Sequence, residues 1–181
     1  MERVLLKRIL KDDLARYRRK PNIKDRILKN ESWFIFHYIR HMRYVEYYMD
    51  RGGLSKVFYL WHLFKFKRLG FLLHYTIYPG TVGPGFRIYH VGGFTHIGRN
   101  VRIGSNCTMQ PGVVFGNKTE VEDDRAVFVG DNCYFGLNAK ILGPVTIGNN
   151  VTVGANAVVT KDIPDNAVVV GVPAKILRIN G

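Results

Sequence analysis

Apolar side chains recur every six residues over the second half of this chain. One series runs from Ile97 to Phe115, and the spacing resumes from Val129 to Val159. Four positions after each of these lies a second residue that is mostly small or β-branched, as at Val101. This period is typical of one flat side of a parallel β-helix, in which three sides close a triangular coil of about 18 residues. The coils readable from the spacing are 97–114, 129–146 and 147–164.

The register is broken near the expected start of the coil. Val82, Ile88 and Phe94 are one hexad apart, which predicts that the coil begins near Ile77 or Val82. Ile97 then follows Phe94 by only three residues, directly after a pair of glycines. We expect a local irregularity of the coil at this point.

Two further segments depart from the repeat. The polar and charged stretch 116–128 is out of register and predicts an exposed loop. Residues 165–181 predict a cap over the open end of the coil, because an uncovered end exposes strand edges.

The first part of the chain has helical spacing instead. It predicts an amphipathic helix over 1–20 that stops at Pro21, a second helix from Ile23 to about 48, and a third over 54–73. The expected organisation is therefore a basic, aromatic helical region over 1–74, followed by the β-helix over 75–181.

Charge narrows the choice of partners. The formal net charge is +13, and most of the excess lies in the helical region, so anionic partners are expected. Two interpretations of residues 30–75 stay open: the aromatic side chains pack on the coil or a neighbouring subunit, or this region contacts a membrane surface. The positive charge is the one feature that favours a nucleic-acid partner. Because the sequence contains no nucleic-acid recognition motif, we do not expect nucleic acid as a partner.

The cysteines and histidines exclude some kinds of site. Cys107 and Cys133 fall at the small-residue position of the hexad and are expected to be buried thiols. No histidine follows His96, which argues against a metal site shared by several coils. The N-terminus has no signal-peptide core and the chain has no spanning segment, so a cytoplasmic location is expected.

His90 is the candidate for chemistry. It follows the inward-facing Ile88 by two positions, so its imidazole should project outward beside the glycine-rich irregularity. An exposed imidazole there could act as a general base. His96, six residues later, is the alternative base if it stands over the same side of the coil.

An ordered set of motifs resembles the left-handed β-helix acyltransferases, specifically their serine acetyltransferase-like branch. The motifs are Ile88-Tyr-His-Val-Gly-Gly93, Asp124-Arg125, Tyr134-Phe-Gly-Leu-Asn-Ala-Lys-Ile-Leu-Gly143, Val153-Gly-Ala-Asn-Ala-Val-Val-Thr-Lys-Asp-Ile-Pro164 and Gly171-Val-Pro-Ala-Lys175. The resemblance covers about residues 75–178. It implies an acetyl-CoA-dependent O-acetyltransferase without a metal, usually a homotrimer or a dimer of trimers, with active sites between subunits.

The resemblance also implies roles for single residues. His90 would remove the proton of an acceptor hydroxyl while that oxygen attacks the thioester, and the acetyl-CoA would lie in a groove along the coils. The residues that match the family's acetyl-CoA contacts are Gly136, Asn138, Ala155, Ala157, Lys161 and Lys175.

The departures from the family pattern concern the acceptor. The family has an aspartate where this chain has Tyr89, a histidine where it has Ala126, and an aspartate that orients the base near Thr76. Tyr89 and Arg125 are therefore the expected acceptor contacts.

These departures argue against free serine as the acceptor. The short, basic and aromatic N-terminal region resembles that of capsule and exopolysaccharide O-acetyltransferases, and this resemblance implies a sugar hydroxyl of a surface polysaccharide, modified at the inner membrane face. Two alternatives stay open. One is a serine O-acetyltransferase of cysteine biosynthesis, and the other is a non-catalytic β-helix scaffold that binds a membrane or a protein.

Overall fold

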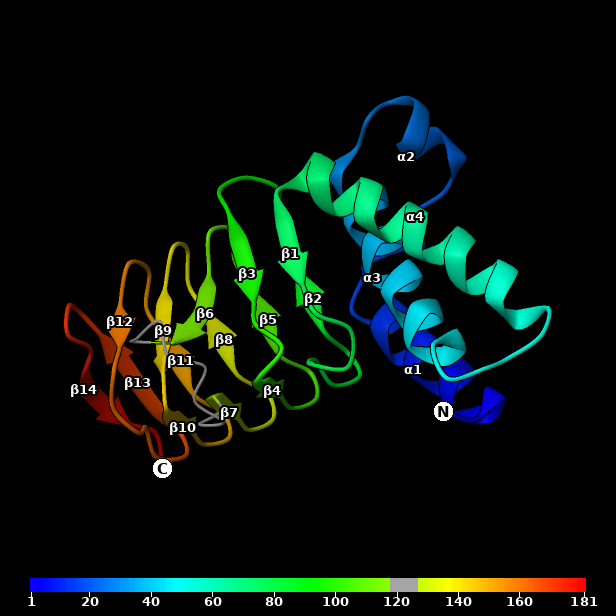
Figure 1. Ribbon diagram of the computed structural model, residues 1–181. Helices are drawn as coiled ribbons and strands as arrows, with labels where there is room; N and C mark the ends of the chain where they lie inside the picture. Colours follow the sequence, from blue (N-terminus) through cyan, green and yellow to red (C-terminus); the bar gives the residue numbers. More distant parts are fainter. Residues whose placement is uncertain (118–126) are drawn as a thin grey trace.

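The computed structural model describes residues 1–117 and 127–181. Helices gather at the N-terminal end, and a left-handed parallel β-helix extends from them to the C-terminus (Figure 1). The helices are α1 (Arg3–Ala15), α2 (Ile23–Ile27), α3 (Glu31–Tyr48) and α4 (Ser55–Leu73). The strands are β1 (Tyr75–Ile77), β2 (Arg87–Ile88), β3 (Thr95–Ile97), β4 (Val101–Ile103), β5 (Thr108–Met109), β6 (Val114–Asn117), β7 (Val127–Val129), β8 (Tyr134–Phe135), β9 (Lys140–Gly143), β10 (Val145–Ile147), β11 (Thr152–Val153), β12 (Val158–Val159), β13 (Ala167–Val170) and β14 (Lys175–Ile179).

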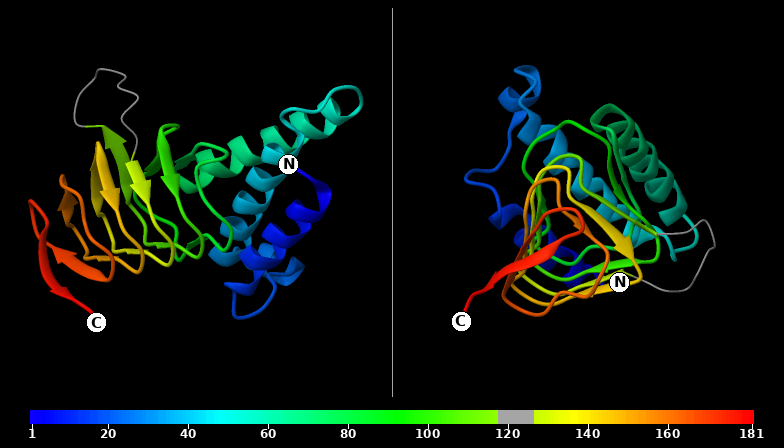
Figure 2. Two further views of the ribbon diagram at one scale, coloured as in Figure 1. Left: turned by 90° about the horizontal axis from the view of Figure 1, so that it is seen from below. Right: turned by 90° about the vertical axis from the view of Figure 1, so that its left-hand side faces the viewer.

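The strands form three sheets, one for each side of a triangular coil (Figure 2). Their orders are β1-β3-β6-β9-β12, β10-β7-β4 and β14-β13-β11-β8-β5-β2. Every pair is parallel except the last, where β14 runs antiparallel to β13. Residues 167–170 thus continue the coil, and the chain reverses only with β14.

The two apolar series of the hexad fill the interior, as the spacing predicts. All of their members, from Ile97 to Ile163, are buried, including Cys107 and Cys133, which are free thiols. Asparagines turn many of the corners in the left-handed backbone conformation, which asparagine tolerates better than most residues. These corner asparagines are Asn106, Asn132, Asn138, Asn150, Asn156 and Asn166.

Phe94 does not belong to the interior series, contrary to the hexad expectation. Its side chain is 57% exposed, whereas Thr95 and Ile97 point inward. Gly92 and Gly93 have positive φ angles of 127° and 61°, which L side chains rarely adopt. The glycine pair therefore lets extra residues leave the coil beside His90, at the expected irregularity.

The helical region also differs from the expected boundaries. The first helix ends at Ala15, well before Pro21, and the expected second helix is interrupted after Ile27. Lys29 takes a positive φ of 52° there, and the Asn30 side chain then accepts a hydrogen bond from the backbone N–H of Ser32. This N-cap begins α3 as a new helix.

Strands occupy both ends of the expected loop 116–128. β6 extends to Asn117 and β7 begins at Val127, so the ends of that segment are strand. The remainder, residues 118–126, lies outside the described residues.

A buried ion pair fixes the helices to the first coil. Arg43 of α3 donates to Asp13 of α1 at 2.9 Å and to the carbonyl oxygens of Val82 and Gly83 at 2.8 and 2.6 Å. Asp13 in turn accepts from the backbone N–H of Gly85 at 2.9 Å. Because a buried charge without its partner is costly, this network sets where α3 lies against the coil.

Candidate active site

His90 lies at a corner of the first coil, just after β2. Its side chain is 60% exposed, as expected for an outward-facing imidazole. The buried Tyr75 hydroxyl donates to the carbonyl oxygen of His90 at 2.6 Å, which fixes the backbone at this corner. Burial raises the pKa of Tyr75, so the phenol stays protonated and keeps this bond.

Glu31, at the first turn of α3, holds the imidazole. Its Oε1 lies 2.6 Å from Nδ1 of His90, and its Oε2 accepts from the backbone N–H of Val91 at 3.1 Å. A carboxylate only accepts hydrogen bonds, so Nδ1 carries the proton. Nε2 of His90 is then the unprotonated nitrogen of the neutral ring and can take a proton from a substrate.

The sequence did not identify Glu31 as this partner. At the family's aspartate position the sequence offers only Thr76, which leaves the support of His90 open, and in the structure Thr76 lies in β1 and pairs in register with His96 of β3. Glu31 and His90 are 59 positions apart, and no motif connects them. The only local signal is an acidic residue directly after the Asn30 N-cap.

His96 does not stand over the same side of the coil as His90. It lies on β3, whereas His90 follows β2, and these strands belong to different sheets of the coil. The His96 ring stacks on Phe94 with 5.8 Å between ring centroids, and burial lowers its pKa.

Tyr89 lies beside the base in a basic environment. Its side chain is 39% exposed, and the Arg87 guanidinium is 4.0 Å from its ring centroid. Arg16 lies nearby, since its carbonyl oxygen accepts a hydrogen bond from Arg87. Arg125, the other expected acceptor contact, lies outside the described residues, as does Ala126.

Successive coils extend the edge on which His90 lies. Ile88 pairs with Met109, Met109 with Phe135, and Phe135 with Val153. The residues two positions after these partners therefore occupy corresponding corners, which places Ala155 on the same edge as His90. With about 4.8 Å between strands, three coils separate the two by about 14 Å along the axis.

Gly136 and Asn138 lie along this edge as well. A Cβ on Gly136 would be 2.6 Å from the backbone nitrogen of Ala155, so the two coils approach closely there. A Cβ on Gly112 would be 2.0 Å from Oδ1 of Asn138, and one on Gly93 would be 3.1 Å from Cα of Gly112. Gly93, Gly112 and Asn138 therefore stack on one another at the corners of successive coils, and Gly93 follows His90 by three residues.

The other three residues expected to contact acetyl-CoA differ in how exposed they are. Ala157 is fully buried in the interior of the coil, and its role in binding acetyl-CoA stays a prediction. Lys161 is exposed, and Lys175 is exposed on β14. Both lysines lie near the C-terminal end of the coil. Within residues 1–117 and 127–181, no three histidine, cysteine or acidic side chains form a metal-binding group.

Comparison with known proteins gives one consistent family. The model described as the hexapeptide repeat of succinyl-transferase matches residues 95–122 and 126–161. A serine acetyltransferase from Bacillus pumilus is 32% identical over 152 residues, covering 76% of this chain and 70% of that protein. One from Mycobacterium tuberculosis is 42% identical over 102 residues, covering 56% of this chain and 44% of that protein.

A solved structure agrees in fold across nearly the whole chain. The crystal structure of the serine acetyltransferase from Neisseria gonorrhoeae has a TM-score of 0.74 at 30% sequence identity, covering 97% of this chain and 66% of that one. The chain thus spans less than two thirds of several relatives that it matches. It belongs to the hexapeptide-repeat acyltransferases, in the serine acetyltransferase family.

Proposed function

We propose that this protein transfers an acetyl group from acetyl-CoA to a hydroxyl group, with His90 as the general base. The observation that carries the proposal is the contact of 2.6 Å between Glu31 and Nδ1 of His90. This contact leaves Nε2 of the exposed His90 imidazole free to accept a proton at a corner of the first coil. The family membership and the motifs around His90 support the same chemistry.

The proposed reaction needs no covalent enzyme intermediate. Nε2 of His90 takes the proton of the acceptor hydroxyl while its oxygen bonds to the thioester carbonyl carbon. The tetrahedral intermediate then collapses, the carbon–sulfur bond breaks, and the CoA sulfur recovers the proton from the imidazolium. Glu31 stabilises the positive charge that His90 carries between these two steps.

The donor would lie along the edge shared by His90 and Ala155. Gly136 has no side chain there, so the pantetheine arm can approach the backbone closely. The exposed Lys161 and Lys175 are positioned toward the far end of the coil, where they would meet the phosphates. A serine acetyltransferase structure from Brucella abortus contains coenzyme A, which is consistent with this choice of donor.

L-serine is the first candidate for the acceptor. The relatives are named serine acetyltransferases, and the Neisseria gonorrhoeae enzyme was also solved in complex with serine. A polysaccharide sugar is the second candidate, and Tyr89 favours it. An aromatic ring backed by Arg87 suits the face of a sugar, whereas it provides no carboxylate for the ammonium group of serine.

We also propose a homotrimer as the active assembly. Ala155 is exposed on the coil edge, and a neighbouring copy would close a groove over this edge for the donor. Sedimentation velocity of the purified chain would test this, and an active monomer would contradict it.

The test of the function is acetyl-CoA consumption by the wild-type protein and by His90→Ala. Each is assayed with L-serine and with a panel of neutral and anionic sugars. We expect turnover with one acceptor class, and its loss in His90→Ala together with unchanged CoA binding by calorimetry. Absence of both turnover and CoA binding would refute the proposal and favour a non-catalytic scaffold.

A further inference from the structure

Helix α4 is apolar around most of its circumference, and one face is buried against the protein. The inner face buries His62, Phe66, Gly70 and Leu73. Seven apolar side chains of α4 are each more than half exposed, and five of them lie in its first ten residues: Val57, Phe58, Leu60, Trp61 and Phe64. Phe58 stacks on Tyr48 of α3 and Trp61 lies edge-on to His41, but both rings stay more than half exposed. We call these five residues, with the basic side chains beside them, the α4 surface. A helix that is apolar all round is normally covered on both sides, so this surface needs a partner.

The charged side chains of α4 itself are all positive. Lys56, Lys67 and Arg68 are exposed on the same helix, and the Lys65 ammonium lies 5.8 Å from the Trp61 ring centroid. No Asp or Glu occurs in α4, nor anywhere in the sequence from Arg51 to Thr119. A complementary partner must therefore be anionic as well as apolar.

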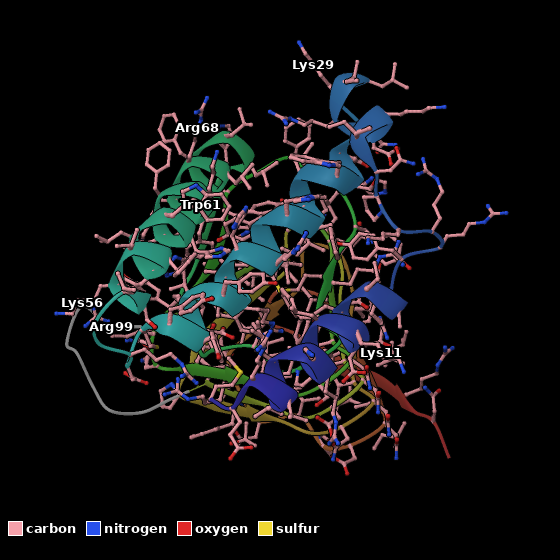
Figure 3. The ribbon with its side chains drawn as sticks, turned by 90° about the vertical axis from the view of Figure 1, so that its right-hand side faces the viewer. Lys11, Lys29, Lys56, Trp61, Arg68 and Arg99 are labelled. Atoms are coloured by element: carbon pink, nitrogen blue, oxygen red, sulfur yellow. The ribbon has the colours of Figure 1, made fainter. Side chains whose placement is uncertain are left out.

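Helix α2 repeats this chemistry at the same end of the molecule. Ile27 and Leu28 are 73% and 78% exposed, and Lys24, Arg26 and Lys29 lie among them. α2 and α4 lie at the helical end, away from the C-terminal end of the coil (Figure 1). Lys29 and Arg68 both extend along the upper side of that end (Figure 3).

We propose that the α4 surface docks on an anionic lipid bilayer. The apolar side chains would enter the boundary between headgroups and acyl chains, with Trp61 at the headgroup level and the lysines on lipid phosphates and carboxylates. At 1.5 Å per residue, α4 is about 28 Å long, and it would lie in the plane of the membrane. Within the described residues, no helix is long and apolar enough to cross a membrane.

The charges argue against a second copy as the partner. A symmetric pair of α4 surfaces would bring Lys56, Lys67 and Arg68 of one copy against the same residues of the other. Like charges in contact destabilise such an interface. An anionic bilayer satisfies both the apolar side chains and these cations, and its attraction is about 1 kcal/mol, or fivefold in affinity, per basic residue.

Vesicle co-sedimentation with the full chain tests the proposal. Vesicles of phosphatidylcholine with about 30% phosphatidylserine should bind the wild type, and vesicles of phosphatidylcholine alone should not. The triple variant Lys56→Gln, Lys67→Gln, Arg68→Gln should bind on the order of 100-fold more weakly. All three positions are exposed, so we expect the variant to fold normally.

A matched control removes the same charge elsewhere. Lys7→Gln, Arg8→Gln and Lys11→Gln lie on exposed positions of α1, and Lys11 lies on the opposite side of the helical end from Arg68 (Figure 3). This variant should keep most of the affinity. An equal loss in both triple variants would mean that net charge alone drives binding and would overturn the proposal.

Tryptophan fluorescence provides a second readout. The chain has two tryptophans, so Trp33→Phe leaves only Trp61. Its emission should shift to the blue on anionic vesicles and be quenched by brominated lipid. An unchanged Trp61 signal in vesicle-bound protein would overturn the proposal, as would a self-association that Phe64→Ser abolishes without any vesicle binding. These readouts involve no acetyl transfer, so they can fail independently of the proposed function.

Discussion

Glu31→Gln tests the positioning of the base. The substitution removes the charge but keeps an oxygen that can accept from the Val91 N–H, now 3.1 Å from the carboxylate. A hydrogen bond to a charged group contributes about 1.5–3 kcal/mol. The two side chains are 60% and 35% exposed, so solvent screening favours the lower part of that range. A glutamine can also donate to Nδ1 and favour the wrong tautomer, so we expect kcat to fall by about 10–100-fold.

The assay is steady-state acetyl transfer with the acceptor identified for the wild type. Because Glu31 lies on α3 and not along the coil edge, the KM for acetyl-CoA should stay near its wild-type value. Glu31→Asp retains the carboxylate and should recover part of the lost kcat. Glu2→Gln is the matched control, because it removes one negative charge at the start of α1, where the Glu2 side chain makes no cap hydrogen bond.

Two results would refute this reasoning. One is a Glu31→Gln variant with full kcat, which would mean that His90 needs no carboxylate. The other is a drop in kcat that follows a lower unfolding midpoint, which would assign Glu31 a purely structural role.

Three further predictions concern stability. Arg43→Met should lower the free energy of unfolding in urea by about 3–5 kcal/mol, since it leaves the 2% exposed Asp13 as an unpaired buried charge. Gly136→Ala should cost about 1–3 kcal/mol and weaken CoA binding by calorimetry, because its Cβ would meet backbone at 2.6 Å. Burial, with repulsion between the pair, lowers the pKa of His41 to about 3, and burial lowers that of His62 to about 4. As the pH falls below about 6.5, these two histidines therefore take up protons in the unfolded chain before they do so in the folded protein. At about pH 5.5 the free energy of unfolding in urea should be lower by about 1–2 kcal/mol, after allowance for screening.

Each of these predictions has a control. Gly52→Ala, where a Cβ would meet nothing within 4 Å, should leave stability nearly unchanged. A wild-type stability at Gly136→Ala would mean that the two coils separate easily at this corner. For Arg43→Met, a loss below about 1 kcal/mol would contradict the view that this network fixes α3. In His41→Phe, the decrease in the free energy of unfolding at acid pH should be smaller than in the wild type. An unchanged decrease would mean that other titratable groups cause it.

The sequence by itself determined the coil. Each side of the triangle is one hexad, and the choice of an inward residue at Ile97 or Phe135 depends only on its place in that hexad. Backbone pairing then follows, because stacked hexads bring equal positions together. The same local logic placed His90 outside the coil and left Cys107 and Cys133 as buried thiols.

Only the tertiary structure decided what supports His90. The family's orienting aspartate falls near Thr76 in the sequence, which left this support open, and the carboxylate beside His90 comes from Glu31 instead. Glu31 reaches the imidazole because Arg43, Asp13 and the Asn30 cap fix the start and position of α3 on the first coil. Such a contact depends on how two separate elements pack, and no periodicity within either element encodes it.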